Sequence, residues 1–464
     1  MNILFIFSRH SENPNDSTLT KDLSDEFFRQ GNNVTVVTLL EKKYKRETEL
    51  KKENGYEVLR VKTGNYFNIS NKIEKGITVL TMASDLKKGI IKYLGDRKFD
   101  LIITHTPFVS TEKLINPLKE YFKCPTYLIL WDIFPQNAKD IGILNNNLLF
   151  SFFKYKEKKM LSTYDRIWCM SKGNINYLKD NYSYLDKNKI KLLRNWAIIK
   201  PNIEINKKEI RSKYGLLEDE FIAIFGGNMG KPQKLENILS LAEKNLENKK
   251  IKFLFIGNGS EKRRLEKLTK ENNLSNVIFI NQVPREDYEK ITASCDVGLV
   301  SLDERFTVPN FPSKTTDYFK LSLPILASLD RCAAEDYGNF LQNEVKGGLF
   351  AEASNIEELH NQFMKLYIDE NLRKALGNNG RKYYEEYLGV DKAYKTIMNE
   401  IGRWKMSIFA GKTLLITGGT GSFAGWYIAG MITLGLILIM AAPYIYGVQA
   451  ELYLKLKANS SVIY

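Results

Sequence analysis

The stretch that decides the fold is FGGNMGKPQKLENIL, residues 225–239. It begins within the apolar run of Phe221–Gly227, which is typical of a buried strand. It leads into a segment whose apolar residues recur at helical spacing, namely Leu235, Ile238, Leu239 and Ala242. A strand, a glycine-rich turn and a helix in this order predict the first unit of an α/β domain with a parallel sheet.

The turn itself has the composition of a diphosphate site. Gly226, Gly227 and Gly230 allow the backbone to approach a ligand closely, and Lys231 and Lys234 add positive charge near the start of the helix. A glycine-rich turn with lysines facing solvent is the alternative interpretation.

Strand and helix patterns alternate on both sides of this segment. After it, we expect strands at Ile251–Gly259, Val277–Val283, Val297–Leu302 and Pro324–Ser328. Before it, we expect strands at Asn2–Phe7, Asn33–Leu40, Tyr56–Val61, Leu101–Thr106, Thr126–Asp132, Arg166–Ser171 and Ile190–Asn195, with an amphipathic helix at Thr18–Gln30. Most of these runs are apolar on both faces, as parallel strands covered by helices must be. The sequence therefore predicts two doubly wound α/β domains that face each other across a cleft.

Two more segments of the second domain carry possible ligand contacts. The turn IGNGSEKRRL places Gly257 and Gly259 after the second strand of this domain. In PNFPSKTTDYF, Ser313 and Lys314 stand where a helix begins and Asp317 lies one turn further on, where a carboxylate could accept hydrogen bonds from two ribose hydroxyls. The alternative is an ordinary helix start, with Ser313 as the cap and Asp317 as a first-turn acid.

Composition and charge exclude several classes of protein. The 464 residues are too many for one compact domain, and 26% of them are charged, which argues against disorder and against a many-helix membrane protein. Lys and Arg number 68 against 54 Asp and Glu, a formal charge of +14, but the lysines are scattered, so we expect no nucleic-acid partner. The four cysteines lie far apart and predict free thiols.

Six segments in order make residues 1–405 resemble the retaining glycosyltransferases of the GT-B fold, family four. They are LWDIFPQNAKDIGIL, LLRNWA, FGGNMGKPQKLENIL, FIGNGSEKRRL, VPREDYEKITASCDVGLVSL and FPSKTTDYF. The most similar branch contains the L-fucosamine transferases of O-antigen and capsule synthesis. The resemblance implies two Rossmann-like domains and a nucleoside diphosphate sugar, UDP-linked, as donor substrate.

The resemblance also implies roles for individual residues. Asn228 and Lys234 take the two positions that grip the donor diphosphate. Pro309 replaces the first of the family's paired acids and Asp317 takes the place of the second, as the ribose ligand. Ser313 and Lys314 match the segment that touches the phosphates, whereas Gly257 and Gly259 would border the base.

Two residues at strand ends of the first domain are candidates for catalysis. Asp132 follows a strand where many relatives carry a histidine facing the cleft, and it could orient or deprotonate the acceptor. His105 is the competing candidate, although a histidine at a strand end is more often structural. No His/Cys ligand cluster and no Asp-x-Asp motif stands in a plausible site, so we expect no metal and no cofactor.

The end of the chain differs from the rest, because no charged residue occurs from Thr413 to Ala450. Residues 406–425 resemble the truncated amino terminus of an extended short-chain dehydrogenase-like dehydratase or epimerase, with Ala424 replacing the last glycine of its phosphate loop. Residues 426–448 are apolar for long enough to predict a single transmembrane helix, with a buried soluble helix as the alternative. The cations that precede it predict that the enzyme faces the cytoplasm, at the inner membrane.

These patterns predict a domain organisation. We expect an acceptor domain at 1–200, a donor domain at 201–385, a helix returning to the first domain at 386–405, the dehydratase-like remnant at 406–425, the membrane helix at 426–448 and a short tail at 449–464. A further lysine-rich stretch, Phe67–Leu94, could touch lipid, and a helix packed on the sheet is its alternative. Its apolar residues are Ile69, Ile73, Ile77, Leu80, Met82, Leu86, Ile90 and Leu94.

The expected function is sugar transfer, with retention, from a nucleoside diphosphate donor to a polyprenyl-diphosphate-linked saccharide in envelope polysaccharide synthesis. The donor sugar would be an N-acetylated amino or deoxyamino sugar. The first alternative is a catalytically inactive sugar-nucleotide-binding or scaffold subunit. A dinucleotide-dependent oxidoreductase is a third hypothesis, and it rests on the incomplete phosphate loop of the tail alone.

Overall fold

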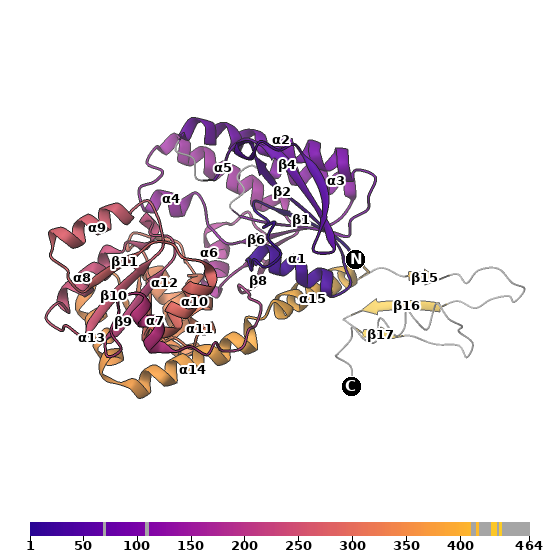
Figure 1. Ribbon diagram of the computed structural model, residues 1–464. Coiled ribbons are helices and arrows are strands. Elements are labelled where there is room, and N and C mark those ends of the chain that lie inside the picture. The colour runs from indigo at the N-terminus through magenta and orange to yellow at the C-terminus, as the bar shows by residue number, and fades with distance from the viewer. Residues whose placement is uncertain (68–70, 107–110, 410–413, 417–427, 434–435, 439–464) are drawn as a thin grey trace, which may run out of the picture. The chain divides into compact units, whose positions relative to one another are not determined.

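The computed structural model describes residues 1–67, 71–106, 111–409, 414–416, 428–433 and 436–438. The chain divides into two compact units, Met1–Ala393 and Tyr394–Tyr464. The first unit holds two mainly parallel sheets with helices around them (Figure 1). The predicted pair of doubly wound α/β domains is therefore confirmed.

The first sheet has eight strands in the order β3-β4-β2-β1-β5-β6-β7-β8. Every pair is parallel except β3 with β4. The strands are β1 (Asn2–Phe7), β2 (Asn33–Glu41), β3 (Glu49–Glu53), β4 (Tyr56–Thr63), β5 (Leu101–His105), β6 (Thr126–Leu130), β7 (Arg166–Cys169) and β8 (Ile190–Leu192). The strand order reverses beside β1, and ligands of such sheets bind at the carboxyl ends of the strands near this point.

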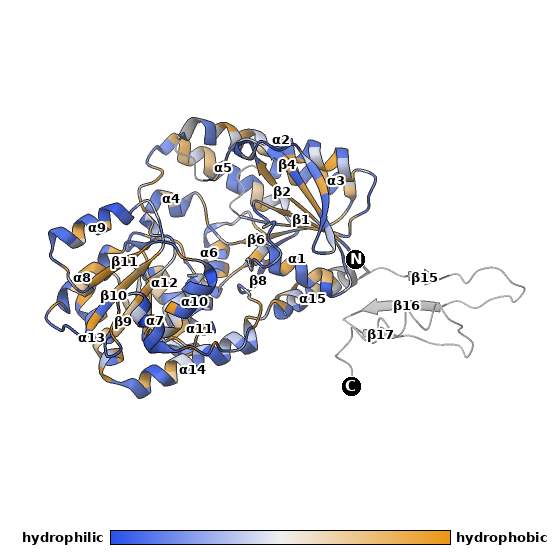
Figure 2. Cartoon of the chain, in the orientation of Figure 1, coloured by the Kyte–Doolittle hydropathy of each residue, from blue (hydrophilic) through white to orange (hydrophobic). Residues whose placement is uncertain are grey.

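Both faces of this sheet are covered, as its apolar strands require. On β1, Leu4 and Ile6 belong to the same buried cluster as Leu86 of helix α2 (Lys72–Leu94). Phe5 points to the other face and meets the ring of Phe27, from α1 (Leu19–Arg29), at 5.3 Å between ring centroids. Figure 2 shows the resulting contrast between apolar strands and the polar outer sides of the helices.

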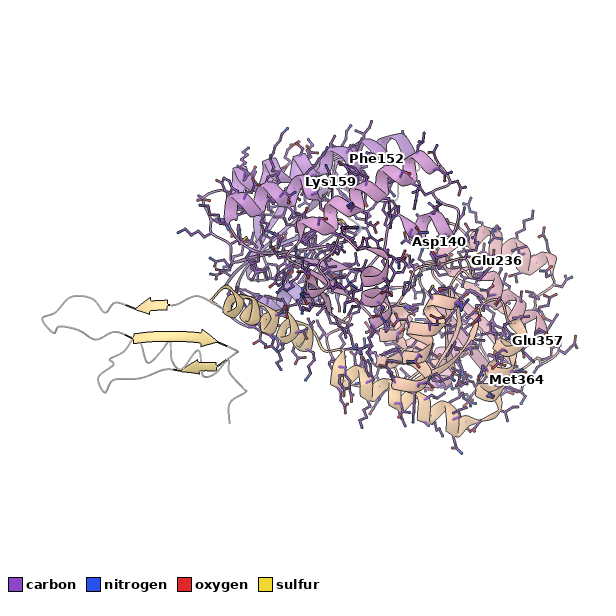
Figure 3. The ribbon with its side chains drawn as sticks, turned by 180° about the vertical axis from the view of Figure 1, so that it is seen from behind. Asp140, Phe152, Lys159, Glu236, Glu357 and Met364 are labelled. Atoms are coloured by element: carbon purple, nitrogen blue, oxygen red, sulfur yellow. The ribbon has the colours of Figure 1, made fainter. Side chains whose placement is uncertain are left out.

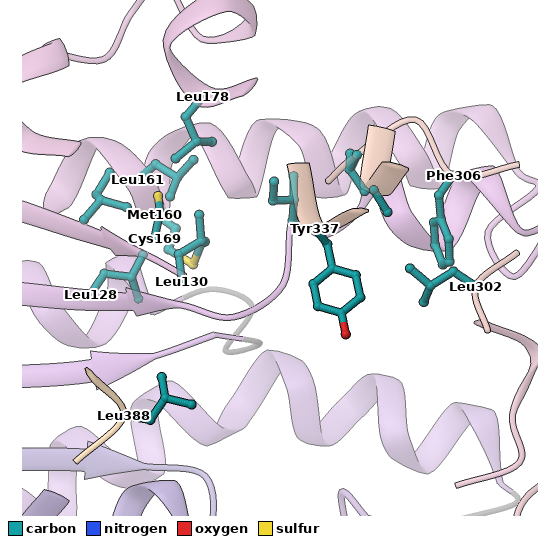
Figure 4. Close-up of a cluster of buried hydrophobic side chains, with 14 of the residues drawn as sticks. Leu128, Leu130, Met160, Leu161, Cys169, Leu178, Leu302, Phe306, Tyr337 and Leu388 are labelled. Carbon is teal, nitrogen blue, oxygen red and sulfur yellow. The ribbon is translucent and has the colours of Figure 1, made fainter. Parts of the chain in front are cut away.

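The other helices of this domain follow the strands in turn. They are α3 (Glu112–Phe122), α4 (Gln136–Asp140), α5 (Asn147–Thr163) and α6 (Lys172–Asn181). The inner side of α5 contributes Met160 and Leu161 to the buried cluster, together with Leu128 and Leu130 of β6 and Leu178 of α6 (Figure 4).

The second sheet has six parallel strands in the order β11-β10-β9-β12-β13-β14. They are β9 (Phe221–Gly226), β10 (Ile251–Ile256), β11 (Val277–Ile280), β12 (Val297–Ser301), β13 (Ile325–Leu329) and β14 (Gly348–Glu352). The strand order reverses between β9 and β12. The loops that follow these two strands therefore meet at the edge where ligands of doubly wound sheets bind.

Helices cover both faces of the second sheet. They are α7 (Lys207–Lys213), α8 (Glu236–Lys244), α9 (Lys262–Glu271), α10 (Arg285–Ser294), α11 (Lys314–Lys320), α12 (Arg331–Ala333), α13 (Ile356–Ile368) and α14 (Glu370–Tyr387). On β9, Phe225 shares a cluster with Ile238 of α8, whereas Ile224 shares the other cluster with Tyr318 of α11. Short 3-10 and π turns lie at Lys42–Tyr44, Lys187–Lys189, Lys231–Gln233, Ala334–Gly338 and Phe340–Glu344.

The linker that joins the two domains follows β8 and contacts α14. The segment after β8 forms a parallel bridge, Ala197 with Gly389, just beyond α14. The Tyr384 hydroxyl of α14 donates to the carbonyl of Ile198 at 2.9 Å, and Arg381 donates to the carbonyl of Lys200 at 2.6 Å. Helix α14 therefore fastens the linker that joins the domains.

Two strands of the first unit were absent from the sequence-based prediction. β3 has the sequence ELKKE, and its charged side chains are tolerated because it is an antiparallel strand at the edge of the sheet. β14, GLFAE, is the edge strand of the second sheet. The predicted strands otherwise match observed ones, although several end earlier than expected; β10, for example, ends at Ile256 and not at Gly259.

The predicted helix at 426–448 is wrong wherever the structure describes this segment. Ile428–Thr433 and Leu436–Leu438 are strands β16 and β17, which pair in antiparallel fashion. Within the described residues, no helix is both long and apolar enough to cross a membrane. Leu414–Ile416 forms β15, and the predicted phosphate loop at 417–425 lies outside the described residues. Helix α15 (Val390–Phe409) covers most of the interval predicted as a returning helix.

The sheet-packed alternative for α2 holds for the C-terminal half of the apolar side chains considered, whereas Ile69 lies outside the described residues. Met82, Leu86, Ile90 and Leu94 are buried, and α2 packs against β4. Ile77 and Leu80 are exposed. The predicted lipid-touching face is therefore mainly a core face.

Candidate active site

Two loops at the carboxyl edge of the second sheet, those that follow β9 and β10, lie in close contact. Gly227, which follows β9, donates its backbone N–H to the carbonyl of Ile256 at 2.8 Å. A Cβ atom on Gly257 would lie 2.1 Å from the Gly227 carbonyl oxygen, and one on Gly259 would lie 2.2 Å from that of Met229. Gly227 and Gly257 also have positive φ, +116° and +138°. The predicted glycines therefore meet, and they allow one loop to approach the other.

Lys314 faces this glycine loop. Its Cε lies 3.4 Å from the position of a Cβ on Gly227, and its ammonium nitrogen lies 4.4 Å from the centroid of the Phe225 ring. Burial lowers the pKa of Lys314 to about 8, and the nearby charge of Asp317 opposes this shift. In the described part of the chain, no carboxylate lies within ion-pairing distance of its ammonium group. The side chain is therefore a poorly hydrated cation beside a glycine loop, which suits an anionic ligand.

The other predicted cations lie on the same loop. Asn228 and Lys231 are exposed, and Lys231 begins the 3-10 turn Lys231–Gln233, which Lys234 follows with a φ of +39°. The Lys234 ammonium lies 2.5 Å from a carboxylate oxygen of Glu304, which follows β12. The structure therefore brings the β9 and β12 loops together through a charged pair at the point where the strand order reverses.

Ser313 and Asp317 have different surroundings. Ser313 is exposed and its side chain makes no capping hydrogen bond to α11. Asp317 accepts two hydrogen bonds from Arg285, one of them 3.2 Å long. A ribose hydroxyl on Asp317 would have to share the carboxylate with Arg285, or displace it.

The sequence analysis missed the residues of α10 that adjoin this site. Arg285 also pairs with Glu289 at 2.9 Å, and Glu289 pairs with Lys320 of α11 at 2.6 Å. The Tyr288 hydroxyl lies 2.1 Å from the position of a Cβ on Gly226, so this glycine makes room for the tyrosine. The signal was present in REDYEK, where Arg285 and Glu289 have helical i,i+4 spacing.

In the first domain, Asp132 follows β6 near the carboxyl edge of the sheet. The backbone N–H groups of Trp131 and Asp132 donate to the Thr106 hydroxyl at 2.9 and 3.0 Å, which fixes the loop. The Asp132 side chain is exposed, and partial desolvation by the neighbouring protein raises the pKa of its carboxyl group. A carboxylate with a raised pKa is a suitable proton acceptor.

His105 is buried and both of its ring nitrogens are engaged. Nε2 accepts a hydrogen bond from the backbone N–H of Ser8 at 3.0 Å, so Nδ1 carries the proton and donates to the carbonyl of Thr106 at 2.5 Å. Burial lowers the pKa of His105 to about 4. These contacts favour a neutral ring that holds the ends of β1 and β5 together, and Asp132 is the better-placed candidate for proton transfer.

Pro309, which stands where the resembling family carries an acid, contacts the first domain. The Pro309 carbonyl accepts a hydrogen bond from Asn174 of α6 at 2.8 Å, and Gly173 of the same helix donates its N–H to Asp336 at 2.9 Å. The loop that carries Pro309 therefore lies against the first domain. Among the described residues, no group of three or more His, Cys, Asp or Glu side chains could hold a metal ion.

Comparison with a model of the family described as "Glycosyl transferases group 1" gives a match over residues 206–383. This range contains the glycine loop, Lys314 and Asp317. An uncharacterized glycosyltransferase of Methanocaldococcus jannaschii is 26% identical over 333 residues, which are 70% of this chain and 82% of the relative. A putative colanic acid biosynthesis glycosyl transferase of Escherichia coli, WcaI, is 30% identical over 89 residues, 19% of this chain and 21% of the relative.

Solved structures share the fold over most of the chain. A sucrose-phosphate synthase from Thermosynechococcus elongatus has a TM-score of 0.67 at 17% identity, over 88% of this chain and 99% of that one. Anabaena HepE in complex with UDP and glucose has a TM-score of 0.63 at 13% identity, over 87% and 100%. The two Rossmann-like domains therefore have the GT-B arrangement.

Proposed function

We propose that this chain, a glycosyltransferase whose group 1 domain spans residues 206–383, catalyses one specific reaction. The chain transfers a sugar from a UDP-linked donor to a polyprenyl-diphosphate-linked saccharide during polysaccharide synthesis, with retention at the anomeric carbon. The donor sugar is an N-acetylated amino or deoxyamino sugar. The reaction takes place at the cytoplasmic face of the inner membrane.

One observation carries the proposal: Lys314 is a half-buried cation that faces the Gly227 loop. The negative charge of a diphosphate bound at this loop would stabilise the charged form of Lys314, which burial disfavours. Lys314 would also stabilise the negative charge that develops as UDP departs. The crystal structure of Anabaena HepE with UDP and glucose supports a nucleotide in a fold of this kind.

The first domain supplies the acceptor side of the reaction. Asp132 stands at the carboxyl edge of its sheet and can accept a hydrogen bond or a proton from the acceptor hydroxyl. The reaction requires no metal or cofactor, because the Lys314 and Lys234 side chains supply positive charge. His105 then positions the β1 and β5 loops without touching substrate.

The test is a screen of UDP-sugars with a polyprenyl-diphosphate saccharide, read by mass spectrometry and by the NMR coupling constant of the new anomeric proton. We expect product with the donor's own anomeric configuration, formed equally well in EDTA. Inverted product would contradict retention, and loss of activity in EDTA that Mn²⁺ restores would contradict a metal-free reaction.

Pro309 favours a second candidate function, a catalytically inactive sugar-nucleotide-binding subunit. It stands where the family carries an acid, and its carbonyl is bonded to Asn174. This candidate predicts that UDP binds but that no donor is consumed with any acceptor. A partner subunit would then have to supply the transferase activity.

A further inference from the structure

The outer side of helix α5 carries an exposed apolar stripe. Leu148 is 84% exposed, Phe152 41% and Tyr155 54%, and these residues follow one another at i, i+4 and i+7 along the helix. Leu149, beside them, is 44% exposed. Figure 3 shows Phe152 and Lys159 on the outer side of the first domain. Large apolar side chains gathered in this way on a surface mark a contact region.

Lysines are interleaved with this stripe. Lys159 continues it one turn further, with its ammonium 4.7 Å from the centroid of the Tyr155 ring, and Lys158 lies 5.0 Å from that of Tyr184. Both lysines are exposed. The only acid of α5 is Glu157, which is buried and pairs with Lys154 at 2.7 Å. The outer side of α5 is therefore apolar and positive, with no acid of its own to neutralise it.

A hollow of about 350 Å³ lies beside the stripe. Its lining includes Lys154, Tyr155, Lys158, Tyr182 and Tyr184. The Lys158 ammonium beside aromatic walls would suit a phosphate group attached to a less polar body, and Lys154, which pairs with Glu157, lies next to it. The hollow and the stripe lie on the same side of α5, because Tyr155 and Lys158 belong to both.

We infer that this surface, the α5 face formed by Leu148, Leu149, Phe152, Tyr155, Lys158 and Lys159, docks on a membrane that contains anionic phospholipids. The leucine and aromatic side chains enter the interface, and the lysines contact lipid phosphates. A second copy of the chain is a poor occupant, since a two-fold contact would place the same lysines opposite one another. The surface lies on the proposed acceptor domain, so docking would bring that domain to a lipid-linked substrate.

The experiment uses the full chain and vesicles of phosphatidylcholine, with or without phosphatidylglycerol. We expect binding that needs phosphatidylglycerol and weakens with salt. The double substitution Leu148→Glu/Phe152→Glu should lower the partition coefficient more than tenfold. Lys158→Gln/Lys159→Gln should lower it about fivefold per lysine. Ile368→Glu is the matched control, because Ile368 is 75% exposed on α13, and it should bind as the wild type does.

A local probe tests whether α5 itself, and not the charge-free C-terminal segment, contacts the membrane. A fluorophore sensitive to polarity, attached at Ser151→Cys on α5, should shift to shorter wavelength on anionic vesicles, whereas one at Ser240→Cys on α8 should not. Unchanged partition of both double variants, or no shift at Ser151→Cys, would overturn the proposal. So would a wild-type dimer that Leu148→Glu/Phe152→Glu converts to a monomer without a change in vesicle binding. The affinity for UDP should be the same in all these variants, so failure here leaves the proposed reaction untouched.

Discussion

The ammonium nitrogen of Lys314 lies 4.4 Å from the centroid of the Phe225 ring, at the base of the glycine loop that follows β9. The aromatic face offers the cation a weak partner, and burial lowers its pKa to about 8. Because the ordinary value for lysine is near 10.4, the folded protein holds this proton weakly, and a bound anion would strengthen its binding. If the proposed diphosphate binds here, its binding and the protonation of Lys314 are therefore coupled.

This coupling predicts a pH dependence for UDP binding. With a pKa of about 8, Lys314 is mostly charged at pH 7, and only about one molecule in ten is charged at pH 9. If the charged form binds the diphosphate, the affinity for UDP should fall about tenfold between these pH values. Calorimetry at pH 8.5 in buffers of different ionisation enthalpy should show proton uptake on binding.

Lys314→Arg is the control for this coupling. Arginine stays charged throughout this pH range, so the variant should bind UDP with little change from pH 7 to pH 9 and without proton uptake. Lys314→Ala should bind more weakly at all pH values and lower kcat/KM by about 10²-fold. A pH dependence that persists in Lys314→Arg would assign the titration to another group.

A second prediction concerns the pair between Lys234 and Glu304, whose charged atoms lie 2.5 Å apart. A diphosphate on the loop would compete with Glu304 for the lysine. Glu304→Gln should therefore tighten UDP binding, and the gain should be at most about fivefold because the pair is partly exposed. Titration calorimetry measures the change, with Glu357→Gln as the control, since Glu357 pairs with Lys244 away from the loop. Weaker UDP binding by Glu304→Gln would mean that Glu304 holds Lys234 in its binding position.

The glycine loop could be predicted from the sequence because its chemistry is local. Glycines, lysines and a following helix lie within residues 225–239, and one strand and one turn place them together. The partners that come from elsewhere could not be predicted in this way. Glu304 reaches Lys234 and Arg285 reaches Asp317 only because the sheet order β9-β12 and the packing of α10 beside α11 bring distant segments together.

The prediction that failed rested on hydropathy alone. Residues 426–448 are apolar enough for a membrane helix, but an apolar run of β-branched and aliphatic residues also suits a strand, and residues 428–433 and 436–438 are strands. The charged edge strand β3 was missed for the opposite reason, since ELKKE has no apolar pattern to detect. In both segments a strand forms because its backbone makes hydrogen bonds to a neighbouring strand, which a hydropathy pattern does not reveal.

A third prediction tests whether Gly257 is needed for loop packing. Gly257→Ala places a Cβ atom 2.1 Å from the Gly227 carbonyl oxygen, in a backbone with φ of +138°. It should lower the free energy of unfolding by about 3 kcal/mol and abolish UDP binding, because the Gly227 loop must move. Gly215→Ala is the matched control: its φ is +71°, but nothing lies within 4 Å of the added carbon. It should cost about 1 kcal/mol and leave UDP binding intact. Equal losses in chemical denaturation would show that backbone conformation alone explains the effect.

The fourth prediction separates Asp132 from His105. Asp132→Asn should lower kcat about 10²-fold without loss of stability, because Asp132 is exposed and the amide has nearly the shape of the carboxyl group. In the wild type, kcat/KM should fall as the pH falls through the raised pKa of Asp132, because the protonated carboxyl group cannot accept a proton; this limb should be absent from the residual activity of Asp132→Asn.

His105→Ala should behave in the opposite way. It leaves the N–H of Ser8 and the carbonyl of Thr106 without their partner in a buried place, which should destabilise the fold by about 2–5 kcal/mol. The folded fraction should retain its KM for the donor and most of its kcat, because the ring is buried and both of its nitrogens are bonded to backbone groups. Thermal unfolding and steady-state kinetics on the same samples distinguish the two residues. A stable His105→Ala variant with a kcat as low as that of Asp132→Asn would transfer the catalytic role to the histidine.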